Sequence, residues 1–179
     1  MKHTINYYRQ MLIDIRTAMN PDYNPDRDSG LIGDALEMAV KDWYGRPLVM
    51  SKQGRCDIRI GARNYEVKQG GGELGELGKR LVRGSGWVLY IPVVLLDYPL
   101  DKQDGYIMDR ADFLRALQDA GALRSKTPTR GNTKVTIQTF WNRSKNKPHG
   151  RLLDKMLEAF DQYENEELCE FLARTTGQA

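Results

Sequence analysis

Apolar residues recur at helical spacing in two segments near the N-terminus. Residues 4–19 place one every three or four positions, which predicts an amphipathic helix that ends at Asn20 and Pro21. Its expected apolar stripe is Tyr8, Met11, Leu12, Ile15 and Met19. Residues 20–30 are rich in Pro, Asp and Asn and predict a loop. Residues 31–44 predict a second amphipathic helix, which carries Glu37 beside its apolar stripe.

A different period governs residues 55–69. Apolar and polar side chains alternate strictly on both sides of residues 61–64, which predicts a β-hairpin with a four-residue turn. Successive side chains of a strand point to opposite faces, so one face should be apolar. The apolar face would hold Cys56, Ile58, Ile60, Tyr65 and Val67, with Cys56 as a buried thiol. The polar face would hold Asp57, Arg59, Glu66 and Lys68. Because paired strands lie about 4.8 Å apart, Asp57 should be opposite or diagonal to Glu66.

The rest of the chain predicts an alternation of helices and strands. The expected elements are a strand at 47–51, a helix at 73–83, a strand at 87–95, a helix at 109–120, a strand at 134–141 and one or two helices at 150–174. Residues 87–95 are the most apolar stretch, which indicates a central strand buried on both faces, with a bulge or an unpaired side at Pro92. This order predicts an α/β fold, a mixed central sheet flanked by helices. A length of 179 residues fits a single domain spanning 1–179.

Composition narrows the classes of protein and of chemistry. The chain is 40% hydrophobic and 28% charged, as expected for a globular protein in water. No apolar stretch could span a bilayer and the N-terminus lacks a signal-peptide core, so we expect a cytoplasmic protein with no membrane partner. Two cysteines and two histidines cannot support zinc sites made of cysteines alone or schemes that use several histidines. Catalysis would therefore use carboxylates, a lysine and a metal ion.

Charge is distributed unevenly along the chain, although the net charge is only +3. Residues 124–151, called here the basic segment, carry eight lysines and arginines and no acidic residue. Residues 152–170 reverse the balance with seven acidic residues. A concentrated positive segment is typical of a surface that binds a polyanion such as DNA.

Asp57, the triplet Glu66-Val67-Lys68 and Glu37 on the preceding helix together resemble the PD-(D/E)xK nuclease superfamily. The resemblance covers residues 31–95, with Cys56 at the position of the motif's proline. It implies a restriction-endonuclease-like fold and a divalent-metal-dependent endonuclease that acts on DNA.

The resemblance also implies roles for individual residues. Asp57 and Glu66 would bind Mg²⁺ or Mn²⁺, with the carbonyl of Val67 as a third ligand and Glu37 in the outer shell or at a second ion. Lys68 would orient or deprotonate the attacking water and stabilise developing charge. The expected contacts to DNA are Lys79, Arg80, Arg83, Arg130, Lys134, Arg143, Lys145 and Lys147. By analogy with small nucleases that act on both strands, a homodimer is possible.

Three other interpretations compete with catalysis. The polar face of the hairpin could be an exposed ladder of ion pairs, each worth a few tenths of a kcal/mol. The chain could bind nucleic acid on the same fold without cleaving it. It could also be a protein-interaction module that uses the acidic helices after residue 150.

Overall fold

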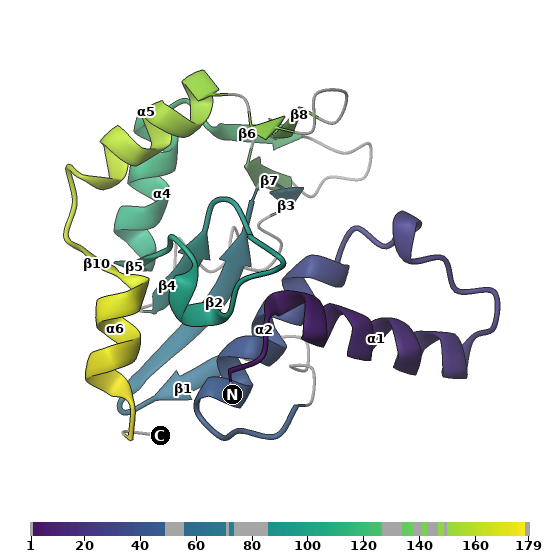
Figure 1. Ribbon diagram of the computed structural model, residues 1–179. Helices are drawn as coiled ribbons and strands as arrows, with labels where there is room; N and C mark the ends of the chain where they lie inside the picture. Colours follow the sequence, from purple (N-terminus) through teal and green to yellow (C-terminus); the bar gives the residue numbers. More distant parts are fainter. Residues whose placement is uncertain are drawn as a thin grey trace.

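The computed structural model describes residues 2–48, 56–70, 72–73, 86–126, 134–137, 141–142, 147–148 and 150–177, and it is drawn in Figure 1. Its helices are α1 (Ile5–Met19), α2 (Leu31–Trp43), α4 (Arg110–Asp119), α5 (Gly150–Phe160) and α6 (Leu168–Thr175). Two short 3-10 helices are η1 (Pro25–Arg27) and η2 (Leu100–Lys102). None of the helices in these ranges is both long and apolar enough to cross a lipid bilayer.

A five-stranded mixed sheet forms the centre of the molecule, in the order β1-β2-β4-β5-β10. Its strands are β1 (Ile58–Ile60), β2 (Arg63–Gln69), β4 (Trp87–Ile91), β5 (Tyr106–Asp109) and β10 (Asn165–Glu167). Strands β2 and β4 run parallel and the other neighbours run antiparallel. The predicted α/β class, with a mixed central sheet flanked by helices, is therefore confirmed.

Smaller strands lie outside this sheet. They are β3 (Gly72–Glu73), β6 (Leu123–Lys126), β7 (Lys134–Ile137), β8 (Trp141–Asn142) and β9 (Lys147–Pro148). The order β3-β7-β6 makes a three-stranded sheet, and β8 pairs with β9. Glu73 lies in β3, whereas the sequence predicted that a helix would begin there. The remaining residues of that predicted helix, 74–83, lie outside the described ranges.

Each face of the central sheet is covered by its own hydrophobic core. Ile58, Val67 and Leu89 face a cluster that contains residues of α1, α2 and α6. Val88 and Tyr90 face a second cluster built with α4 and α5. Because β4 is the middle strand and supplies both clusters, its prediction as a central strand buried on both faces is confirmed. The strand ends at Ile91, before Pro92, whose lack of an N–H prevents further pairing.

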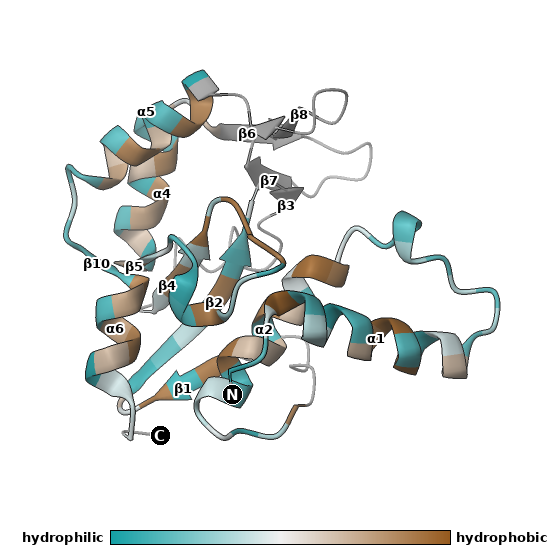
Figure 2. Ribbon diagram, in the orientation of Figure 1, coloured by the Kyte–Doolittle hydropathy of each residue, from teal (hydrophilic) through white to brown (hydrophobic). Residues whose placement is uncertain are grey.

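Helix α1 follows its predicted bounds but is only partly buried. Its alternating apolar and polar bands are visible in Figure 2. Ile5, Tyr8 and Leu12 are buried, whereas Ile15 is 47% and Met19 is 81% exposed. The predicted stripe therefore contacts the core over its first turns only.

The hairpin is confirmed, with a tighter turn than predicted. Ile60 pairs with Arg63, so two residues and not four make the turn. Gly61 has a φ of +57°, the left-handed conformation that two-residue hairpin turns require and that glycine adopts without strain. Ile58 pairs with Tyr65, and Asp57 comes just before β1 with its N–H bonded to the carbonyl of Tyr65.

Several other predicted boundaries were wrong. Pro47 and Leu48 are not in a strand, and the rest of the strand predicted at 47–51 lies outside the described residues. Strands β5 and β6 were not predicted. The helical region predicted at 150–174 is interrupted by β10, which adds an edge strand to the sheet. Cys56 is half-buried rather than buried.

Candidate active site

Asp57 is held against the middle of β2 by two hydrogen bonds. Its backbone N–H donates to the carbonyl of Tyr65 at 3.1 Å, one residue before β1 begins. Its Oδ2 accepts from the N–H of Val67 at 2.7 Å. The carboxylate is thus fixed against the strand that carries Glu66 and Lys68.

Glu66 is buried, with 8% of its surface exposed, and it lies between two cations. Nζ of Lys68 is 3.9 Å from its Oε2. Nη2 of Arg110 is 3.7 Å from its Oε1. A buried carboxylate needs such compensation because removal from water disfavours its charged form.

Glu37 lies in α2 with 9% of its surface exposed, and it forms an ion pair with Lys41 one turn later. Lys41 is also buried, at 7% exposure. Spacing of four residues places both side chains on one face of the helix. Glu37 is close enough to Asp57 for its charge to affect the ionisation of that carboxyl. The structure therefore brings Glu37, Asp57 and Glu66 into one electrostatic environment.

This crowding of carboxylates changes the acidity of Asp57. Burial, followed by the charges of Glu66 and Glu37, raises the pKa of Asp57 from 3.8 to about 7. The Val67 N–H and the Lys68 ammonium oppose that rise and are outweighed. Burial, followed by the charges of Glu66 and Asp57, raises the pKa of the Cys56 thiol. The local field thus favours an added positive charge beside Asp57.

The donor chemistry fits a hard divalent cation. Asp57 and Glu66 offer carboxylate oxygens, the ligand type that Mg²⁺ prefers, and Mg²⁺ commonly uses only one or two protein carboxylates because it keeps several waters. In the described part of the chain, no three His, Cys, Asp or Glu side chains form a preassembled metal site.

Two cations of this site were not among the predicted site residues. Helical spacing places Lys41 beside Glu37 in the sequence, but no role was predicted for it. Arg110 could not be found from local spacing, because it starts α4, a helix far along the chain from Glu66. Arg110 is only 5% exposed, and its guanidinium fills the space over Gly86, where a Cβ would approach Nη2 to 2.7 Å.

Two of the eight predicted DNA contacts lie in strands that the structure describes. The backbone of Lys134 lies in β7 and that of Lys147 in β9. The other six positions, Lys79, Arg80, Arg83, Arg130, Arg143 and Lys145, lie outside the described residues.

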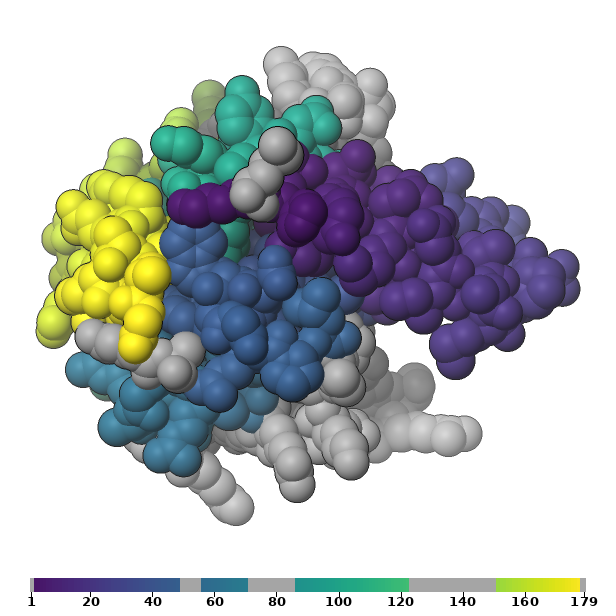
Figure 3. Space-filling view, turned by 60° about the horizontal axis from the view of Figure 1, so that its bottom comes forward, coloured from purple at the N-terminus to yellow at the C-terminus, as the bar shows by residue number. Residues whose placement is uncertain are grey.

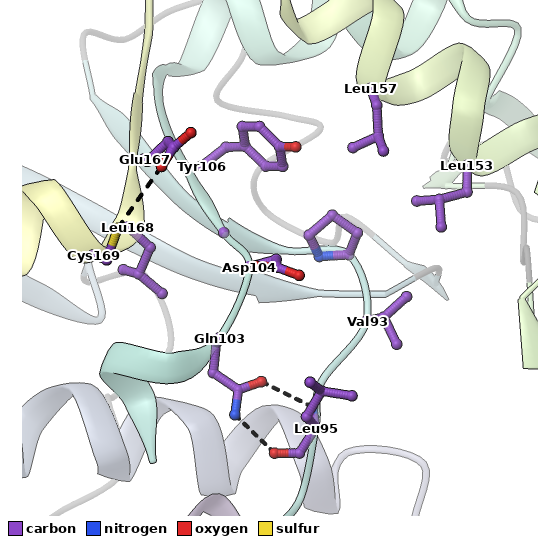
Figure 4. A pocket seen from close by; sticks show the side chains of 12 residues that line it. Val93, Leu95, Gln103, Asp104, Tyr106, Leu153, Leu157, Glu167, Leu168 and Cys169 are labelled. Atoms are coloured by element: carbon purple, nitrogen blue, oxygen red, sulfur yellow. Dashed lines mark hydrogen bonds between the residues drawn. The ribbon is translucent and has the colours of Figure 1, made fainter. Parts of the chain in front are cut away.

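A separate cavity of about 330 Å³ lies between the β4–β5 connection, α5 and the start of α6 (Figure 4). Leu153 and Leu157 of α5 point into it, and Glu167 and Asp104 supply carboxylates. Gln103 bonds its amide to both backbone groups of Leu95. Its lining residues, within the part of the chain that the structure describes, include no lysine or arginine.

Comparison of the chain with protein-family models, with curated proteins and with solved structures finds no match to any of them. The case for a function therefore depends on the geometry of the site.

Proposed function

We propose that the chain is a divalent-metal-dependent endonuclease that hydrolyses phosphodiester bonds in DNA, with an active site of the PD-(D/E)xK type on a restriction-endonuclease-like sheet. One observation carries this proposal. Asp57, just before β1, is hydrogen-bonded to Tyr65 and Val67 on either side of Glu66, Lys68 lies beside Glu66, and burial together with the charges of Glu66 and Glu37 raises the pKa of Asp57 to about 7. Perturbed carboxylates of this kind are characteristic of functional sites.

Asp57 and Glu66 would hold Mg²⁺ or Mn²⁺, with the Val67 carbonyl and Glu37 as further oxygen donors. Bound there, the ion would supply positive charge to the phosphate and lower the pKa of a water molecule. The Val67 N–H fixes the Asp57 carboxylate in place before any ion binds, so little reorganisation would be needed.

Lys68 would act directly on the reacting groups. Its side chain is 29% exposed, so its ammonium is accessible to a substrate while it remains beside Glu66. It would orient the attacking water and stabilise charge on the phosphate oxygens as that water adds. The electrostatic contribution should dominate, because the transition state places additional charge on an already anionic phosphodiester.

Lys41 and Arg110 would support the site from behind. Lys41 pairs with Glu37 and Arg110 with Glu66, and both cations are buried. They would hold these carboxylates in position, which a ligand to a divalent cation requires.

Cleavage of supercoiled plasmid DNA tests the proposal. Wild-type protein should nick or linearise the plasmid with Mg²⁺ or Mn²⁺ and stop when EDTA is added. Asp57→Asn, Glu66→Gln and Lys68→Met should each lower the rate by about two orders of magnitude or more, because each removes a ligand or the charge that stabilises the transition state.

A matched control is Glu167→Gln, which removes an exposed carboxylate from β10 at the opposite edge of the sheet. It should cut the plasmid at the wild-type rate. Full activity in all three site variants, with circular dichroism showing folded proteins, would refute the proposal.

Metal titration separates a nuclease from a protein that only binds DNA. A nuclease should gain thermal stability from Mg²⁺ or Mn²⁺ in a manner that depends on Asp57 and Glu66.

A further inference from the structure

A cationic groove lies beside the candidate active site. It is a cavity of about 510 Å³ between the end of α2 and the first strand of the hairpin. Its lining includes Lys41, Arg46, Asp57, Arg59 and Gly61. Figure 3 shows residues of α2 (blue) and of the hairpin (blue-green) side by side on the face that comes forward. The groove therefore includes Asp57 in its wall.

Local backbone structure places Arg46 at this groove. Gly45 has a φ of +62°, a left-handed conformation typical of the residue that ends a helix. The chain then reverses, and the N–H of Arg46 donates to the carbonyl of Lys41 at 2.8 Å. Arg46 is consequently held over the last turn of α2 with its side chain exposed.

Arg59 reaches the groove from the other side. It lies in the middle of β1, is exposed, and lines the groove together with Asp57. Guanidinium groups present several donors in a planar fork that matches phosphate oxygens. Lys41 adds a third cation at the base of the groove, where it is paired with Glu37.

We propose that this groove binds the sugar-phosphate backbone of the nucleic acid strand next to the linkage that is cut, with Arg46 and Arg59 as its phosphate contacts. The inference rests on the proposed nuclease function and extends it to how the substrate is held. It assigns backbone contacts to residues near Asp57, in addition to those expected in the basic segment.

The test is equilibrium binding of a fluorescein-labelled DNA duplex in EDTA, where cleavage does not interfere, measured by anisotropy from 50 to 200 mM KCl. The double variant Arg46→Ala/Arg59→Ala should raise Kd about tenfold at the middle of this range. The slope of log Kd against log salt concentration should fall by about two, because binding releases about one counterion fewer for each phosphate contact that is lost. With Mg²⁺, the variant should show a higher KM for cleavage and a largely retained kcat.

The matched control is Arg115→Ala/Lys155→Ala, which removes the same charge from exposed positions on α4 and α5 that do not line the groove. It should change Kd less than threefold. Equal losses in the two double variants, or wild-type affinity and slope in the groove variant, would overturn the proposal.

The binding and cleavage measurements distinguish rejection of the groove proposal from rejection of the nuclease proposal. Plasmid cleavage by a groove variant that binds DNA as tightly as wild type would reject the groove and keep the nuclease. Loss of affinity in a protein that never cuts DNA would keep the groove as a binding site and reject catalysis.

Discussion

Asp57 lies in an environment that lowers the stability of the folded protein, which points to a role in function. It is half-buried among two other carboxylates, with one backbone N–H and the charge of Lys68 to offset them. A residue selected for stability alone would avoid this environment, since each neighbouring negative charge opposes its ionisation. Binding of a cation would turn the same arrangement into a favourable one.

The dependence of stability on pH follows from this environment. The folded-state pKa of Asp57 lies above its ordinary value of 3.8, so the folded state holds more protons than the unfolded state between about pH 4 and 7. The free energy of unfolding should therefore fall as pH rises through this window and level off above it. Asp57→Asn removes the ionisation, and in EDTA it should be more stable than wild type by up to roughly 4 kcal/mol above pH 7.

Urea denaturation at intervals from pH 4 to 8 measures this difference. The two proteins should have similar stability near pH 4 and diverge as the pH increases. Asp104→Asn, at an exposed carboxylate of the separate cavity, is the control and should run parallel to wild type. Parallel curves for Asp57→Asn and wild type would show that Asp57 ionises normally.

At the scale of elements, the start of α4 connects helix capping to the site. The Asp109 carboxylate accepts from the N–H of Ala111 at 2.8 Å and of Asp112 at 3.4 Å, which caps the helix. Arg110 is the first residue of that helix, and its N–H donates to the carbonyl of Gly86 at 2.9 Å. The cap thereby fixes the backbone from which Arg110 reaches Glu66.

Loss of this cap should be measurable. Asp109→Ala leaves two helical N–H groups without their acceptor and should lower the free energy of unfolding by about 1 kcal/mol in urea titrations. Asp109→Asn retains a side-chain oxygen that can accept the same bonds, so it should lose only a few tenths. Equal losses in both variants would indicate that charge, and not capping, is responsible.

At the scale of the whole molecule, a buried hydrogen bond joins the region before the hairpin to the C-terminal helix. Tyr44 Oη lies 2.6 Å from Thr175 Oγ1, which also donates to the carbonyl of Phe171 at 2.6 Å. The two residues are 131 positions apart and both are buried. This contact connects α2, which carries Glu37, to α6 on the same face of the sheet.

Thr175→Val should lower the free energy of unfolding by about 1–3 kcal/mol, because the buried hydroxyl of Tyr44 loses its partner. Adding Tyr44→Phe should recover part of that loss, since no unsatisfied donor then remains. Thr176→Val is the control: its hydroxyl bonds within the helix from an exposed residue, so we expect a change within about 0.5 kcal/mol. If the double variant loses as much free energy of unfolding as the two single variants lose together, the two groups are not coupled.

The sequence by itself determined the hairpin, its two faces and the carboxylates that meet there. Strand alternation is a local property with a period of two, so it fixed the faces even though the turn was predicted two residues too long. Helical spacing likewise fixed α1 and α2, and with them the position of Glu37 on its helix.

Tertiary structure decided what surrounds those carboxylates. Arg110, the edge strand β10 and the exposed end of α1 depend on which segments come together across long stretches of chain, and no local period reports that. The raised pKa of Asp57 has the same origin, since burial and the charges of Glu66 and Glu37 act only in the folded state. Local patterns therefore predicted which groups could meet, and packing determined the electrostatic environment in which they meet.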